Sequence, residues 1–301
     1  MRKIILITGA NGFIGTFLSP YLRNLGYEVK RLVRLNSHVI EDYINYVVPD
    51  INKHKNWKEI MIDVDIVIHL ASQLPKFTKK SKYFYEDING TDKLIDAAIK
   101  FNVKKFIFMS SIAANISNNK NFNIAKRKYF FSYSNYVKTK YEIEELIKRK
   151  LNSTKCKYTI IRAPLIYGKN LNGSLLNLSK AIKYNIPLPF KNINNKKSVL
   201  SIENLSSFIV SIIIIPNYHN DLFFISDDYQ PSTEEIIEVI AKKINKKPLL
   251  FYLPFQKSFF FNKLLNKYTV MNRFFGSIQI DNSYAKKTLK WRPKGRFSDH
   301  I

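Results

Sequence analysis

Short apolar runs alternate along the first half of the chain with longer segments whose apolar residues recur at helical spacing. The runs expected to form strands cover residues 3–7, 28–33, 43–48, 65–70, 105–110 and 158–162. Parallel strands need long crossover connections, so strands that alternate with helices indicate a parallel sheet with helices on both faces. The predicted fold class is therefore α/β, a doubly wound parallel sheet.

The pattern becomes less regular after residue 165. We expect one domain over residues 1–165 and a smaller region over residues 166–301, with a strand near 200–226 returning to the sheet at Leu222–Ile225. The smaller region is then discontinuous in sequence. Ser232 followed by Glu235 predicts a capped helix over residues 233–244.

Length and composition fit a globular protein, with 301 residues of which 46% are hydrophobic. The longest apolar run, residues 208–216, is much shorter than the roughly 20 residues that span a bilayer. The single cysteine, Cys156, favours a reducing compartment, and no signal-peptide pattern follows Met1. We therefore expect a cytoplasmic protein without a membrane span.

The net charge of +26 comes from lysines spread along the whole chain. This distribution favours a solvated basic surface over a nucleic-acid or membrane footprint, although it would attract an anionic substrate. Residues 255–275 combine aromatic residues with lysines, which predicts helices that pack over a substrate cleft; contact with a membrane is the alternative.

A glycine-rich turn follows the first predicted strand and precedes a helix. Its glycines, spaced G-x-x-G-x-x-G over residues 9–15, permit a tight turn and close approach of a diphosphate to the helix N-terminus. An ordinary glycine-rich turn is the alternative. The residues expected to hold a dinucleotide here are Gly9, Asn11, Gly12, Phe13, Ile14 and Gly15.

Other candidate ligand-binding residues follow the remaining strands, because ligands bind beyond the carboxyl ends of parallel strands. Arg34 stands at the end of the second strand, where a carboxylate would hold the ribose of NAD and an arginine can pair with the 2′-phosphate of NADP. NADP(H) is therefore the expected cofactor, with NAD(H) as the alternative if Arg34 only stacks on adenine.

Tyr136 and Lys140 lie four residues apart in a predicted helix, so both side chains face the same side. A nearby ammonium favours the phenolate, so Lys140 should lower the pKa of Tyr136 towards a range useful for proton transfer. Ser111, after the fifth strand, could hydrogen-bond the same substrate oxygen. An exposed helix face is the alternative explanation of the tyrosine–lysine spacing.

Together these motifs make the chain resemble extended short-chain dehydrogenases/reductases of the NAD-dependent, nucleotide-sugar epimerase/dehydratase family. The motifs that carry the resemblance are Thr8–Gly15, Asp50-Ile51, His69-Leu70-Ala71, Asn89-Gly90-Thr91, Ser110-Ser111, Tyr136–Lys140, Arg162-Ala163-Pro164, Tyr167-Gly168 and Leu289–Pro293.

The resemblance implies a Rossmann domain over residues 1–165, a nucleotide-sugar region over residues 166–301, and no metal. Tyr136 resembles the catalytic acid/base, Lys140 the residue that holds the nicotinamide ribose, and Ser111 the partner of the substrate oxygen. Lys197 takes the place of an arginine that binds the substrate diphosphate. The remaining cofactor contacts would be Asp50, Ile51, Leu70, Ala71, Ser72 and Pro164, and at His69 the backbone is expected to matter more than the ring.

The resemblance also implies a nucleotide-sugar substrate, UDP-linked, and a homodimer paired through the helices at residues 91–101 and 136–150. Many epimerases of the family have a second hydroxyl two positions after the serine, whereas Ala113 stands there in this chain. With Arg34, this favours an NADPH-dependent reduction of a UDP-2-acetamido-2,6-dideoxy-4-hexulose at C4, for surface polysaccharide. A UDP-glucose or UDP-N-acetylglucosamine 4-epimerase is the alternative, followed by a non-catalytic cofactor-binding relative or an RNA-binding one.

Overall fold

The computed structural model describes residues 2–35, 42–72, 82–117, 135–215, 220–253 and 274–301. The aromatic and basic residues 255–275, expected to form helices over a substrate cleft, lie almost wholly outside this part of the chain.

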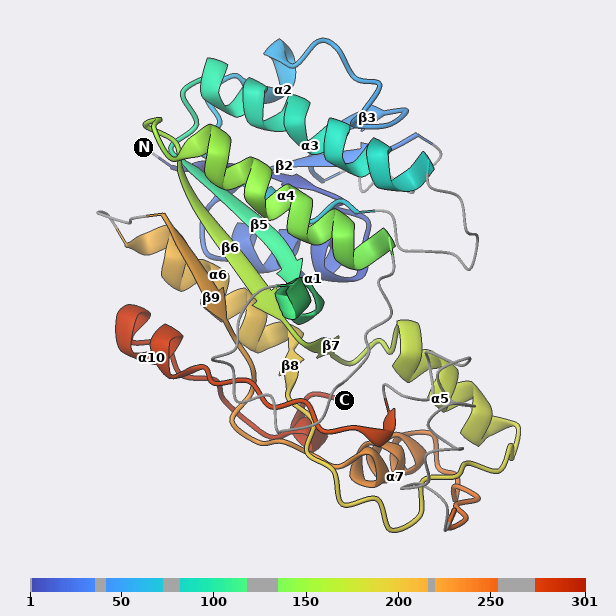
Figure 1. Ribbon diagram of the computed structural model, residues 1–301. Helices are drawn as coiled ribbons and strands as arrows, with labels where there is room; N and C mark the ends of the chain where they lie inside the picture. The colour runs from blue at the N-terminus through green and yellow to red at the C-terminus, as the bar shows by residue number, and fades with distance from the viewer. Residues whose placement is uncertain (1, 36–41, 73–81, 118–134, 216–219, 254–273) are drawn as a thin grey trace. The chain divides into compact units, whose positions relative to one another are not determined.

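The larger of the two sheets has seven strands in the order β3-β2-β1-β4-β5-β6-β9 (Figure 1). Its strands are β1 (Ile4–Thr8), β2 (Glu28–Arg34), β3 (Ile44–Val48), β4 (Ile66–His69), β5 (Lys105–Ser111), β6 (Lys157–Ala163) and β9 (Asp221–Phe224). The pairing is parallel: Thr8 lies opposite both Leu32 and His69. The doubly wound α/β fold and the returning strand are confirmed.

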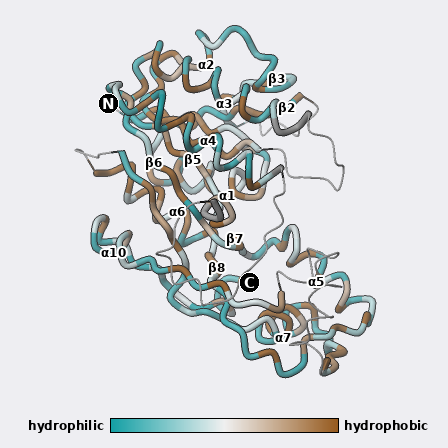
Figure 2. Tube along the Cα trace, in the orientation of Figure 1, coloured by the Kyte–Doolittle hydropathy of each residue, from teal (hydrophilic) through white to brown (hydrophobic). Residues whose placement is uncertain are grey.

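Helices cover the sheet because the strands are apolar on both faces. The helices of this part are α1 (Phe13–Asn24), α2 (Lys58–Met61), α3 (Lys82–Lys100), α4 (Asn135–Leu151) and α6 (Ile202–Ile214), with a 3₁₀ turn, η1 (Ile112–Ser117). Figure 1 shows α3 and α4 side by side over one face and α1 behind the sheet. Leu6, Phe106 and Ile147 belong to the core beneath α3 and α4, and strands β5 and β6 are mainly hydrophobic in Figure 2.

The chain divides into two compact units. The first consists of the described residues within Met1–Ser117, Tyr133–Arg162 and Phe208–Phe223; the described residues within Ala163–Ser207 and Phe224–Ile301 belong to the second. The second unit contains a two-stranded parallel sheet of β7 (Leu165–Tyr167) and β8 (Val199–Ser201). Its helices include α5 (Gly173–Lys183), α7 (Thr233–Lys243), α10 (Ser283–Leu289) and the 3₁₀ turn η2 (Phe297–Asp299).

The helix α7 begins as its sequence predicts. The Ser232 hydroxyl accepts a hydrogen bond of 3.1 Å from the Glu235 backbone N–H, and the Glu235 carboxylate accepts one of 2.5 Å from the Ser232 N–H. This reciprocal pair satisfies two backbone donors that a helix start otherwise leaves open.

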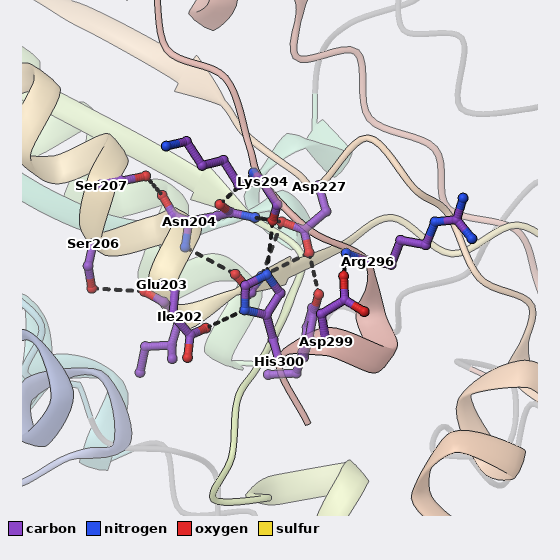
Figure 3. Close-up of polar contacts among 12 residues, drawn as sticks. Ile202, Glu203, Asn204, Ser206, Ser207, Asp227, Lys294, Arg296, Asp299 and His300 are labelled. Atoms are coloured by element: carbon purple, nitrogen blue, oxygen red, sulfur yellow. Dashed lines mark hydrogen bonds and ion pairs between the residues drawn. The ribbon is translucent and has the colours of Figure 1, made fainter.

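A polar network joins the C-terminal residues to the first turn of α6 within the second unit (Figure 3). The Asn204 amide donates to Asp227 at 2.8 Å and to the Lys294 carbonyl at 3.0 Å, and its oxygen accepts from the Lys294 N–H at 2.9 Å. His300 contacts the same Lys294 carbonyl at 2.9 Å and lies 3.4 Å from the Glu203 carboxylate. The buried side chains of Asn204 and Asp227 are thus paired with each other within this network.

Among the residues that the structure describes, we find no helix that combines the length and the hydrophobicity needed to cross a bilayer.

Candidate active site

The glycine turn has no room for side chains at two of its positions. Gly9 has a φ of +67°, and a Cβ there would lie 2.7 Å from the Ala71 backbone nitrogen. A Cβ on Gly15 would lie 2.6 Å from the Gly9 carbonyl oxygen, because α1 packs directly on the turn. Gly12 precedes the first residue of α1, so the helix N-terminus opens at this turn. Such a cradle of bare backbone at a helix N-terminus suits a diphosphate.

A cavity of about 340 Å³ opens beside the turn, within the first unit. It lies at the carboxyl ends of β1 to β4, where the strand order reverses between β1 and β4. Ligands of doubly wound sheets bind at such switch points, and the volume is within the usual range for ligand sites. The lining residues are Gly9, Asn11, Gly12, Leu32, Val33, Arg34, Val48, Asp50, Ile51, His69, Leu70, Ala71, Ser72, Glu86, Asp87, Gly90 and Thr91.

Most residues predicted to bind the cofactor thus surround one cavity. The others lie elsewhere: Phe13, Ile14 and Gly15 form the first turn of α1, and Tyr136 and Lys140 lie on α4. Pro164 and Lys197 belong to the second unit. The sequence did not single out Glu86 and Asp87 on α3, although they follow the fourth strand and precede the Asn89-Gly90-Thr91 motif.

Charged groups of both signs border the cavity. Arg34 is the last residue of β2, lies opposite Val48, and is exposed. The Asp50 carboxylate accepts a hydrogen bond of 2.8 Å from the Asn52 N–H, which fixes the turn after β3. Ser72 donates to Asp87 at 3.0 Å and so connects the end of β4 to α3.

The ring of His69 is the centre of a buried hydrogen-bond chain. Its Nδ1 lies 2.7 Å from the Thr8 hydroxyl and its Nε2 lies 2.9 Å from the Thr91 hydroxyl. Thr91 donates to the Asp87 carbonyl and Thr8 accepts from the Ala71 N–H, so Nε2 carries the proton and Nδ1 accepts. Burial, with the nearby Lys140 charge, lowers the pKa of His69 to about 3, which keeps the ring neutral.

This chain of bonds ties β1, β4 and α3 together beneath the cavity. The prediction that the backbone of His69 matters more than its ring therefore misses a contribution of the ring. Hydrogen bonds between side chains that are distant in sequence leave no spacing signal.

Lys140 is held between α4 and β5. Its ammonium donates a hydrogen bond of 2.9 Å to the Met109 carbonyl and lies 4.7 Å from the centre of the Phe108 ring. Only 4% of the residue is exposed, and this burial lowers its pKa to about 8, while Asp87 and Glu144 act in the opposite direction. Lys140 is therefore protonated below about pH 8.

Tyr136 lies one turn before Lys140, near the start of α4, and is half-buried. Ser111 is the last residue of β5, and its hydroxyl accepts a hydrogen bond of 3.2 Å from the Ala113 N–H. Of the three residues Ser111, Tyr136 and Lys140, it is Lys140 that interacts electrostatically with the cavity. Its charge acts on His69 and is acted on by Asp87, and both of these residues line the cavity.

Residues 5–207 match the model of the NAD dependent epimerase/dehydratase family. The chain belongs to this family. It is 31% identical to a UDP-glucose 4-epimerase of Vibrio cholerae, over 97% of this chain and 92% of that protein. It is also 24% identical to the N-acetyl-alpha-D-glucosaminyl-diphospho-ditrans,octacis-undecaprenol 4-epimerase of Escherichia coli O157:H7, over 85% and 76%.

Solved structures share the fold. A UDP-glucose 4-epimerase from Thermotoga maritima with UDP-glucose superposes with a TM-score of 0.73 at 21% identity, covering 99% of this chain and 96% of the other. A UDP-glucuronic acid 4-epimerase from Bacillus cereus in complex with NAD gives a TM-score of 0.75 at 20% identity, covering 99% and 95%. At these identities the likeness establishes the extended short-chain dehydrogenase/reductase fold of this epimerase/dehydratase family member.

Two predicted residues of this family member lie in its second unit. Lys197 is buried, and burial lowers its pKa to about 7. Its backbone N–H donates to the Pro231 carbonyl at 2.9 Å. Pro164 lies between β6 and β7 and is half-buried.

Proposed function

We propose that this chain is an enzyme that transfers a hydride between a nicotinamide dinucleotide and C4 of a UDP-linked sugar. The observation that carries the proposal is the buried Lys140, one helical turn from Tyr136, beside a cavity built on a glycine turn that has no room for side chains at Gly9 and Gly15. The name of the Vibrio cholerae relative, which this chain matches over 97% of its length, supports the choice of a UDP-sugar.

The glycine turn suits a dinucleotide, since a Cβ at Gly9 or Gly15 would clash with neighbouring backbone and distort the turn. When bound, the nicotinamide supplies or accepts the hydride. In this proposal Tyr136 moves a proton on the C4 oxygen, and Ser111 donates a hydrogen bond to the same oxygen. The Lys140 ammonium stabilises the phenolate of Tyr136 and holds the ribose at pH values below about 8.

The specific reaction that we propose is the NADPH-dependent reduction of a UDP-2-acetamido-2,6-dideoxy-4-hexulose at C4. Two features support it. Arg34 lines the cavity at the end of β2, where it can pair with a 2′-phosphate. Ser111 is followed by Ile112 and Ala113, so the second hydroxyl expected of many epimerases is missing from this position.

A UDP-hexose or UDP-N-acetylhexosamine 4-epimerase is the second candidate. It is favoured by the names of both relatives, which are 4-epimerases, and it would use the same three residues. An epimerase returns the hydride that it removes and gains by retaining NAD, whereas a reductase exchanges its cofactor in every turnover.

The experiment that tests these proposals offers the purified protein UDP-4-keto sugars, UDP-glucose and UDP-N-acetylglucosamine, each with NADPH, NADH or NAD. Loss of one NADPH for each keto sugar consumed supports reduction. Interconversion of UDP-sugars without net change in cofactor overturns reduction in favour of epimerisation. Lack of turnover with every UDP-sugar, despite cofactor binding, overturns the choice of substrate class.

We also propose that the protein forms a homodimer through α3 and α4 and functions in the cytoplasm. Light scattering of the purified protein tests the first statement; a monomer mass at working concentration contradicts it.

A further inference from the structure

Glu144 lies one turn beyond Lys140 on α4 and is completely buried. Arg162, on β6, donates to its carboxylate from Nε at 3.0 Å and from Nη2 at 2.6 Å. Ser110, on β5, donates its hydroxyl hydrogen to the same carboxylate. One side chain of α4 is therefore bonded to two strands of the sheet, and all three residues belong to the first unit.

A buried ion pair of this kind is weak evidence for stability, because removing two charges from water offsets much of their attraction. The two-point contact between guanidinium and carboxylate nevertheless fixes direction as well as distance. The Glu144 contact therefore adds directed bonds to the hydrophobic packing of α4 and restricts its rotation and axial position on β5 and β6.

That position matters because the candidate catalytic groups stand on either side of the contact. Ser110 adjoins Ser111 on β5, and Glu144 shares its helix face with Lys140 and Tyr136 through the spacing of four residues. The distance between the phenol of Tyr136 and the hydroxyl of Ser111 thus depends on how α4 is seated on β5.

We propose that Glu144 is a positioning residue, which through Ser110 and Arg162 sets Ser111, Tyr136 and Lys140 in the relative geometry that the reaction requires. The inference rests on the proposed function. Glu144 itself touches neither substrate nor cofactor in this proposal.

The charge of Glu144 also acts on Lys140. The charges that act on Lys140 come from Asp87 on α3 and Glu144 on its own helix; the titratable side chains near it also include His69 from β4 and Tyr136, one turn earlier on α4. His69 is neutral, while Asp87 and Glu144 raise the pKa of Lys140 against the effect of burial. Neutralising Glu144 therefore lowers the pH at which Lys140 loses its proton.

The test compares Glu144→Gln, Glu144→Asp and the control Glu145→Gln. Glu145 is the next residue, is partly exposed, and pairs with Lys148 of the same helix at 2.8 Å. For each variant, kcat, KM and the Kd of the reduced cofactor are measured from pH 6 to 10. Melting temperature records any loss of fold.

We expect Glu144→Gln to lower kcat by about 10- to 100-fold, since a misplacement near 1 Å can cost about 100-fold in rate, with a much smaller change in KM. As pH rises, the cofactor affinity of this variant should decline at a pH about half a unit or more below that of the wild type. Glu144→Asp keeps the charge but shortens the arm, so kcat should fall while the pH dependence remains that of the wild type. Glu145→Gln should match the wild type in both respects.

Equal kcat and equal pH profiles for Glu144→Gln and Glu145→Gln would overturn the inference. If Glu144→Gln does not fold, Ser110→Ala, which keeps the ion pair, takes its place: a lower kcat at unchanged cofactor Kd supports the inference, and an unchanged kcat overturns it. Failure of the proposed function gives a different result. In that case the wild type turns over no UDP-sugar, while Glu144→Gln still shifts the pH dependence of cofactor binding.

Discussion

The ammonium of Lys140 is bonded to the backbone carbonyl of Met109 at 2.9 Å. Met109 lies two residues before Ser111 on β5, so the same strand positions the Lys140 ammonium and the Ser111 hydroxyl. The bond also satisfies one donor of a lysine that is almost wholly buried. A positive charge is thereby held at a fixed place beside Tyr136 rather than at the end of a mobile side chain.

Removal of the phenolic hydroxyl should separate chemistry from binding. We expect Tyr136→Phe to lower kcat by at least about 100-fold, in the range of a lost general acid/base, while the cofactor Kd changes little. Turnover with the substrate found for the wild type and fluorescence titration with NADPH measure the two quantities. Full activity in this variant would contradict the role assigned to Tyr136.

Removal of the buried Lys140 ammonium should affect both kcat and the cofactor Kd. We expect Lys140→Met to weaken cofactor binding and to reduce kcat, because the charge is assigned to both the ribose and the phenol. In the wild type, cofactor affinity should decline as pH rises through about 8, where Lys140 loses its proton. The same titration on Lys140→Met should show no such decline; a decline that persists there would assign it to another group.

The sheet and the glycine turn could be predicted from the sequence because their signals are local. Strand β1, for example, contains the apolar run Ile4-Ile5-Leu6-Ile7, and the turn depends on residues within one short stretch. The clustering of Arg34, Asp50 and Ala71 around one cavity also followed, because parallel strands bring their carboxyl ends to one edge.

The contacts that stiffen the site could not be predicted in this way. The Glu144–Arg162 pair and the bonds of His69 join residues from different strands and helices. Such contacts depend on side-chain directions after packing, which spacing in a single sequence does not record. The burial of Lys197 leaves no local signal either, because Lys197 follows another lysine, Lys196, in the sequence.

Lys197 provides a prediction about stability. Its pKa falls from an ordinary 10.5 to about 7 in the folded chain because of burial. Between these values the unfolded chain binds more protons, so this residue makes stability rise with pH from about 7 to 10.5. Lys197→Met should therefore raise the free energy of unfolding by about 1 kcal/mol or more at pH 7, and by much less near pH 10.5.

Denaturant titrations at the two pH values measure this effect. The assignment of Lys197 to the substrate diphosphate adds a second outcome, a weaker affinity of the same variant for UDP-sugars. An equal effect on stability at both pH values would contradict the burial argument, and unchanged UDP-sugar affinity would contradict the binding role.

A test of the glycine turn has a control within the chain. In Gly15→Ala the new methyl would lie 2.6 Å from backbone atoms of Gly9 and Ala10, so α1 must move away from the turn. Gly26, with a φ of +87° and open space around it, should lose stability on change to Ala without a change in the cradle. We expect Gly15→Ala to abolish cofactor binding and Gly26→Ala to leave it intact; similar affinities in the two variants would show that the cradle does not hold the dinucleotide.

Arg34 should decide between the two cofactors. An arginine paired with a 2′-phosphate contributes about 1.5–3 kcal/mol, which corresponds to roughly a 10- to 150-fold change in affinity. Arg34→Ala should therefore weaken NADPH binding by this factor and leave NADH binding nearly unchanged, which calorimetry with both cofactors measures. Arg23, an exposed arginine of α1 that does not line the cavity, provides the control Arg23→Ala. If NADH and NADPH weaken equally in Arg34→Ala, the guanidinium stacks on adenine instead, and the preference for NADPH, together with its support for reduction over epimerisation, is lost.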